Sequence, residues 1–277
     1  HLSTRRQRQM CIRDRTWSDD KWPTCAHGGI IPSYGIGHSE AQWFVRGVPN
    51  VKKAFAKVWG TNDLLTSFDG VSLWRPWNID PSWKTQSGQA WFHIDQHPIS
   101  KPGKQCIQGL INLLPTSKEI GGNVVIPKSH NFFKDLPEEY KERVERLPLD
   151  IDHFRFPHDD PKLSSEPAVM AHMEPGDMLL WDSRTIHCSS SGSSLPDGTN
   201  DLIRAASLIC MMPKKLSSKE ILDKRIHAAE NLVSTTNWTN DFRNADEFPI
   251  ILEAENRDQY KWPKKPNLSD YQKELIA

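Results

Sequence analysis

The feature of this sequence that most limits its possible folds is a series of short β-rich segments that do not alternate with helices. Turns rich in glycine and proline connect the segments, as is typical of antiparallel sheets. A doubly wound α/β sheet is therefore disfavoured, and a β-sandwich or β-barrel core is expected. The expected strands span residues 65–74, 89–94, 105–114, 123–126, 168–173, 178–181 and 203–211.

Helices are expected on both sides of these strands, with one more inserted among them. Residues 39–48 and 50–59 show helical periodicity, and a single inserted helix is expected over 137–147. Ser217 can cap a further helix while Glu220 reaches back to it, which is the capping-box pattern. The fold class is thus mainly β with flanking helices.

A chain of 277 residues is expected to form one large core with extensions. Residues 1–15 hold five arginines and one acid, which predicts a disordered or non-native leader, with an organellar targeting peptide as the alternative. Residues 16–212 would then form the β-rich domain with its N-terminal helices. Residues 213–277 would form a helical and irregular extension packed on the core.

Charge, hydropathy and cysteine usage exclude several classes of protein. The chain has 35 basic and 35 acidic residues, so no overall field attracts nucleic acid. It has no apolar run long enough for a membrane span. Its five scattered cysteines indicate reduced thiols in an intracellular protein, and we expect it in the cytoplasm unless its arginine-rich start directs it to an organelle.

Three residues predict a metal site. His93 and Asp95 are two residues apart on an expected strand, so their side chains point to the same side. His187 follows another buried strand and would supply the third ligand. Two histidines and one carboxylate on one face of an octahedron leave open positions, which suits Fe(II) in oxygenases. Taken alone, the His-x-Asp pair is a weak signal, since it often reflects an ordinary loop contact.

Arg204 is the only charged residue in an apolar segment expected to enter the core. A buried cation needs an anionic partner, and a dicarboxylate cosubstrate would provide one by a bidentate contact. An internal ion pair with an Asp or Glu is the alternative. Arg184 competes for the same role, but its odd spacing from His187 turns it to the opposite face of a strand.

These residues, in this order, resemble the phytanoyl-CoA dioxygenase family of Fe(II)- and 2-oxoglutarate-dependent oxygenases. The resemblance covers roughly residues 64–212 and implies a double-stranded β-helix, a jelly-roll or cupin-like core. It implies that His93, Asp95 and His187 bind iron, that Arg204 binds the distal carboxylate of 2-oxoglutarate, and that Ser189 assists it. The chain departs from the family in a longer loop before Arg204. The matching elements are His93-x-Asp95, Gly121 to His130, Pro175-Gly176-Asp177, His187 and Arg204.

The resemblance implies that the protein uses dioxygen to hydroxylate an unactivated C–H bond of a small metabolite or lipid-like substrate. Succinate and carbon dioxide would be released, and ascorbate would serve as reductant in vitro. Because Asp95 is present, hydroxylation is favoured over halogenation. A non-catalytic, metal-binding β-barrel is the alternative. Substrate identity, use of a CoA thioester and oligomeric state stay open.

Other residues that could carry chemistry have simpler interpretations. The acid- and histidine-rich segment 150–160 is expected to be a solvated loop, or a lid if it lies near the metal. Cys188 should point away from His187 and not act with it. His97 is expected at the surface. Three tryptophans could line a pocket or fill the core: Trp74, Trp77 and Trp91.

Overall fold

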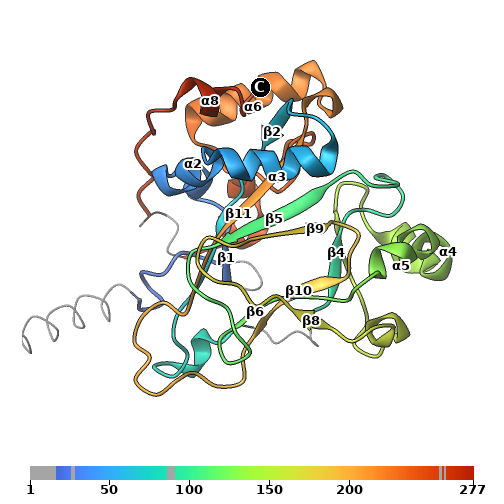
Figure 1. Cartoon of the computed structure of the whole chain (residues 1–277), viewed down its shortest axis with the longest axis vertical. Helices are drawn as coiled ribbons and strands as arrows, with labels where there is room; N and C mark the ends of the chain where they lie inside the picture. Colours follow the sequence, from blue (N-terminus) through green and yellow to red (C-terminus); the bar gives the residue numbers. More distant parts are fainter. Residues whose placement is uncertain (1–16, 26–28, 86–90, 256–257, 259) are drawn as a thin grey trace, which may run out of the picture.

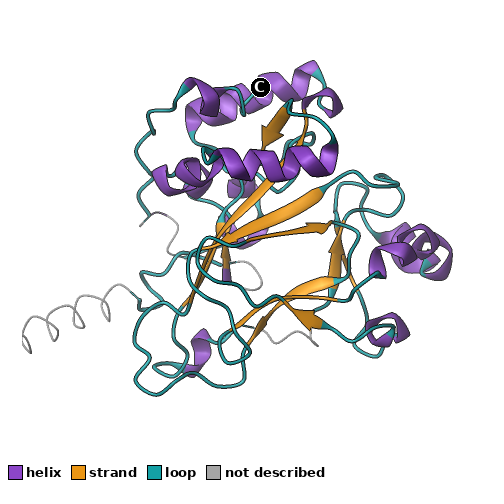
Figure 2. Cartoon of the chain, viewed as in Figure 1, coloured by secondary structure: helices purple, strands orange, loops and turns teal. Residues whose placement is uncertain are grey.

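The computed structural model describes residues 17–25, 29–85, 91–255, 258 and 260–277. Its strands form two antiparallel sheets that lie one over the other (Figures 1 and 2). The leader predicted for residues 1–15 lies outside the described residues. The strands are β1 (Ile30–Ile31), β2 (Leu64–Thr66), β3 (Val71–Trp74), β4 (His93–Asp95), β5 (Ile107–Asn112), β6 (Gly121–Val125), β7 (His153–Arg155), β8 (Val169–Met170), β9 (Met178–Asp182), β10 (His187–Ser191) and β11 (Arg204–Pro213).

The connections between the sheets identify the fold. The first sheet has the order β1-β3-β11-β5-β9, with β2 also paired to β11, and the second has the order β7-β4-β10-β6-β8. From β3 onward the chain passes between the two sheets: β4 lies in the second, β5 in the first, β6 to β8 in the second, β9 in the first, β10 in the second and β11 in the first. This arrangement is a double-stranded β-helix, which confirms the expected fold.

Helices cover the outer face of each sheet (Figure 1). Val45, Phe55 and Ile209 belong to one buried cluster that joins α2 and α3 to the first sheet. Val144 of α5 and Cys188 of β10 belong to the cluster behind the second sheet. The helices are α2 (Glu40–Arg46), α3 (Pro49–Trp59), α4 (Leu136–Glu139), α5 (Lys141–Arg146), α6 (Lys219–Asn231), α7 (Pro249–Leu252) and α8 (Asp270–Lys273).

Two expected elements are interrupted in the structure. The strand expected over 65–74 is divided into β2 and β3 by a bulge that ends at Gly70: both strands pair with β11, but residues 67–70 lie opposite only residues 208–210. A Cβ atom at Gly70 would lie 1.8 Å from the carbonyl oxygen of Ile31, so only glycine fits this close approach. The helix expected over 137–147 is divided at Tyr140, whose φ of −116° and ψ of 34° are not helical.

The helix after β11 begins one residue later than expected. The Oγ atom of Ser218 accepts a hydrogen bond from the backbone N–H of Ile221 at 3.2 Å, so Ser218 caps α6. The expectation that Ser217 caps this helix is therefore wrong. Both serines fit the capping preference, and only the backbone path distinguishes them.

The segment after β11 is bound to the core. Arg225 of α6 is buried and donates hydrogen bonds to the carbonyl oxygens of Thr66 and Leu275. The division into domains stays a prediction.

Among the described residues, no helix has the length and apolar character needed to cross a bilayer. Cys25, Cys106, Cys188 and Cys210 form no disulfide bond within the described part of the chain.

Candidate metal centre

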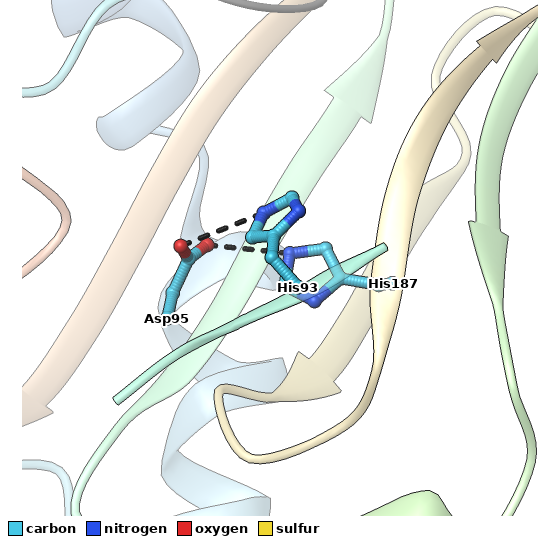
Figure 3. Close-up of side chains that lie close together, drawn as sticks. All are labelled: His93, Asp95 and His187. Carbon is cyan, nitrogen blue, oxygen red and sulfur yellow. Dashed lines mark ion pairs between the residues drawn. The ribbon is translucent and has the colours of Figure 1, made fainter. Parts of the chain in front are cut away.

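Two neighbouring strands bring the three predicted ligands together. His93 and Asp95 lie on β4, and His187 begins β10, directly opposite His93 in the antiparallel register. The Nε2 atoms of His93 and His187 lie 3.5 and 3.3 Å from the carboxylate oxygens of Asp95. Figure 3 shows the three side chains directed toward one point. One ligand atom from each residue lies within 4.8 Å of the other two, which is close enough to hold one metal ion.

Backbone contacts fix the protonation of both imidazoles. The Nδ1 atom of His93 lies 2.9 Å from the carbonyl oxygen of Trp91, and that of His187 lies 2.8 Å from the carbonyl oxygen of Thr185. A carbonyl only accepts hydrogen bonds, so each Nδ1 carries the proton. In its neutral form each ring then has its lone pair on Nε2, the atom that faces the centre, as a metal ligand requires.

The electrostatics of the centre favour the ligand forms of His93 and Asp95. Burial, together with His187, lowers the pKa of His93 to about 4 despite the opposing effect of Asp95. Burial alone would raise the pKa of Asp95, but the neighbouring His93, His153 and His187 hold it well below its usual range. At neutral pH, His93 is therefore neutral and Asp95 is ionised.

Two further residues contact the carboxylate of Asp95. The Nε2 atom of Gln108 donates to Oδ2 at 3.1 Å, and the Nδ1 atom of His153 lies 3.5 Å from Oδ1. Sequence reasoning missed both residues. A polar side chain on the inner face of an apolar strand was the available signal for Gln108. His153 lies on the edge strand β7, opposite Asp95 in register.

The centre opens into a cavity of about 510 Å³ between the two sheets. Ser189, two residues after His187, lines this cavity, as does Arg204 at the start of β11. The structure thus brings the five predicted site residues to one cavity. Trp91 also lines it, whereas Trp74 and Trp77 belong to a buried apolar cluster beside it.

Arg204 is buried, and no acidic side chain of the described residues pairs with it. Its side chain is 1% exposed, and its Nε and Nη1 atoms have no hydrogen-bond partner among the described residues. Its guanidinium lies over the ring of Trp74, with 4.7 Å between Cζ and the ring centroid. Burial lowers the pKa of Arg204 to about 10, so it stays charged at neutral pH. The expected alternative, an internal ion pair, is not seen in the described part of the chain.

The competing residues are occupied elsewhere. Arg184 lies in the turn between β9 and β10, not on a strand as expected, and donates hydrogen bonds to both carboxylate oxygens of Asp182, at 2.8 and 2.7 Å. Cys188 points into the cluster behind the second sheet, and burial raises the pKa of its thiol to about 12. Neither residue contributes to the centre.

Two expectations about polar residues are wrong. His97 is completely buried, not at the surface, and its Nδ1 accepts hydrogen bonds from the backbone N–H groups of Ile99 and Ser100. Residues 150–160 are not simply a solvated loop, because β7 belongs to the second sheet. In addition, Asp152 forms an ion pair of 2.7 Å with Lys101.

Comparisons with known proteins agree with this geometry. The family model for phytanoyl-CoA dioxygenase (PhyH) matches residues 43–195, more than half of the chain. "Ava biosynthesis cluster protein O" of Aspergillus versicolor is 32% identical over 231 residues, covering 80% of this chain and 70% of the relative. A "putative phytanoyl-CoA dioxygenase" of Dictyostelium discoideum is 23% identical over 265 residues, covering 83% and 69%.

Solved structures include similar chains. The epimerase SnoN, in complex with Fe³⁺, α-ketoglutarate and nogalamycin RO, is 15% identical with a TM-score of 0.47. The match covers 74% of this chain and 73% of SnoN.

Proposed function

The chain belongs to the phytanoyl-CoA dioxygenase family, and from this premise we propose that it is an Fe(II)- and 2-oxoglutarate-dependent dioxygenase. Its reaction would be hydroxylation of an unactivated C–H bond in a small molecule. The name of the Aspergillus relative refers to a biosynthesis cluster, which supports a small-molecule substrate.

In this proposal, His93, Asp95 and His187 hold the metal. The two imidazoles and the carboxylate form the donor set that Fe(II) prefers in oxygenases, and they leave positions for cosubstrate and dioxygen. Gln108 and His153 hold the Asp95 carboxylate in place by contacts to its two oxygen atoms. Such contacts orient a ligand and strengthen metal binding.

Arg204 binds the distal carboxylate of 2-oxoglutarate, with Ser189 beside the same cavity. The observation that carries the proposal is the guanidinium of Arg204, which is buried at the cavity of the triad with no acidic partner among the residues that the structure describes. A dicarboxylate would supply the missing anion, and a planar guanidinium matches it in a bidentate contact. A purely structural metal site gives no reason for this cation.

When bound, iron would activate dioxygen as the oxidant, with 2-oxoglutarate supplying two electrons as it is oxidised to succinate and carbon dioxide and the substrate C–H bond supplying the other two. The protein contributes orientation and exclusion of water. The Nδ1–H groups of His93 and His187 donate to backbone carbonyl oxygens, so neither group supplies a proton to the cavity. The buried sheet interior separates the reacting groups from bulk solvent.

Release of labelled carbon dioxide from 2-oxoglutarate labelled at the 1-carboxylate tests the proposal. Purified protein with Fe(II) and ascorbate should release it, and His93→Ala and His187→Ala should abolish release. His227→Ala, at an exposed histidine of α6, is the matched control and should keep full activity. Metal binding without any binding or turnover of 2-oxoglutarate would instead support the non-catalytic metal-binding barrel.

A further inference from the structure

The cavity extends beyond the triad to segments outside the two central sheets. Residues of the segment that follows α6 form one side of it, and this segment lies outside the part matched by the family model. We call residues 235–249 the C-terminal wall. Ile30, Pro32 and Ile151 line the cavity as well. The wall residues that line the cavity are Thr235, Thr236, Asn237, Trp238, Arg243, Phe248 and Pro249.

Hydrogen bonds and a cation–π contact fix the C-terminal wall to the core. The N–H of Thr235 donates to the carbonyl oxygen of Phe68 at 3.0 Å, and the N–H of Tyr34 donates to Oδ1 of Asp246 at 2.7 Å. The Nζ atom of Lys101 lies 3.8 Å from the ring centroid of Trp238, which is buried. The wall is therefore a fixed part of the cavity, suited to selecting a ligand by shape.

The charged side chains around this part of the cavity neutralise one another. Arg243 lies 3.8 Å from Asp152 and 3.5 Å from Asp241. Lys101 lies 2.7 and 2.9 Å from the same two carboxylates, which completes a set of two cations and two anions. Asp69, which also lines the cavity, lies 3.8 Å from Arg46.

Arg204 is thus the one cation without an acidic partner among the described residues that line the cavity. The proposed function assigns it to 2-oxoglutarate. An acyl-CoA carries several phosphates, which would need further free cations to replace their hydration. The remaining surface is mainly apolar and includes Trp181, Trp238 and Phe248.

We infer that the substrate is an uncharged, mainly apolar molecule that the C-terminal wall selects, and not an acyl-CoA thioester. This inference rests on the proposed function, because it uses the space left beside the metal and 2-oxoglutarate. A cavity of about 510 Å³ is in the range that holds a drug-sized ligand.

Binding of three probes to nickel-loaded protein saturated with 2-oxoglutarate tests the inference. The probes are hydroxyprogesterone, its hemisuccinate ester and palmitoyl-CoA. Their binding is measured by the quenching of tryptophan fluorescence. The neutral steroid should bind at least about tenfold more tightly than either anion, because the cavity offers no counterion for a buried carboxylate or phosphate.

Variants locate the binding surface. Phe248→Lys places a charge on the C-terminal wall and should weaken binding of the neutral probe about tenfold. Ile151→Lys, at another residue that lines the cavity, should have the same effect and guards against a folding defect of the first variant. Ile250→Lys is the matched control, since Ile250 is exposed and does not line the cavity.

Separate results decide the two proposals. Failure of 2-oxoglutarate itself to bind the nickel-loaded protein would count against the proposed function. If 2-oxoglutarate binds but the neutral probe does not, or an anionic probe binds as tightly, the inference about the substrate is overturned. Equal effects of the Phe248 and Ile250 variants would overturn the role of the C-terminal wall.

Discussion

Some polar atoms in the cavity lack a partner within the described part of the chain. Besides Arg204, these are the buried Oδ1 atom of Asn123 and the buried Nε1 atom of Trp181, and both residues line the cavity. Such atoms lower stability, and native proteins keep them mainly where another function requires them. Bound ligands are therefore expected to complete these hydrogen bonds.

Replacing Arg204 with methionine should weaken binding of 2-oxoglutarate by about ten- to a hundredfold. The reason is the loss of charge-assisted hydrogen bonds of about 1.5–3 kcal/mol. Thermal stability should stay the same or rise, because the variant removes a buried cation without a partner. Calorimetric titration of the metal-loaded protein measures the affinity.

Arg184→Met is the control for that prediction. Arg184 is an arginine of the same region, but it is already paired with Asp182. Its replacement should leave the affinity for 2-oxoglutarate unchanged. A similar loss of affinity in both variants would contradict the assignment of Arg204.

His38 should make the stability of the protein depend on pH. Its ring is buried, its Nε2 lies 2.9 Å from the carbonyl oxygen of Val233, and burial with the nearby Arg46 lowers its pKa to about 3. Below pH ~6.5 the unfolded chain takes up a proton there that the folded chain does not, so stability falls as the pH falls.

The variant His38→Gln removes this titration and can keep the hydrogen bond. From about pH 7 to about pH 5, the wild type should lose about 2 kcal/mol of unfolding free energy relative to the variant. Urea denaturation at several pH values measures the difference. If the unfolding free energies of the two proteins changed with pH in the same way, the buried imidazole would not be the cause of the pH dependence.

At the level of elements, sequence patterns predicted which segments form strands better than where they end. The alternation in 105–114 agrees with β5, whose Ile107 and Ile111 pack outward while Gln108 and Leu110 face inward. The break at Gly70 was not predictable, because it depends on the approach of β1, a segment far away in the sequence. β7 was missed because three residues on a sheet edge carry almost no periodic signal.

The start of α6 can be tested directly. Ser218→Ala should lower the unfolding free energy by about 1 kcal/mol, because the N–H of Ile221 loses its side-chain acceptor. Ser217→Ala should have a much smaller effect, since the Ser217 hydroxyl has no hydrogen-bond partner among the described residues. Equal losses in the two variants would argue against the observed cap. Chemical denaturation measures both.

At the level of the whole molecule, the sequence predicted the metal centre more completely than the cavity around it. The centre needs only three side chains on two neighbouring strands, and strand periodicity together with the family resemblance identifies them. The C-terminal wall comes from residues 235–249, which show no regular pattern and meet the cavity only through long-range contacts. Contacts of this kind are not encoded in local spacing.

Long-range contacts also predict that residues 270–277 stabilise the β core. Leu275 is completely buried against α3 and the first sheet, and its carbonyl oxygen accepts a hydrogen bond from the N–H of Thr66 at 2.9 Å. Leu275→Ala should therefore lower the unfolding free energy by about 2–5 kcal/mol.

Deletion of residues 270–277 should be more harmful still, because it also removes two carbonyl acceptors of Arg225. The buried guanidinium would then lose partners that offset its desolvation. Lys273→Ala, within the deleted segment, is the control. The ammonium group of Lys273 is exposed and pairs with Asp270 of the same segment at 3.0 Å. Thermal unfolding should show one transition, shifted down in the first two variants. A truncated protein that unfolds like the wild type would show that the core is stable without this segment.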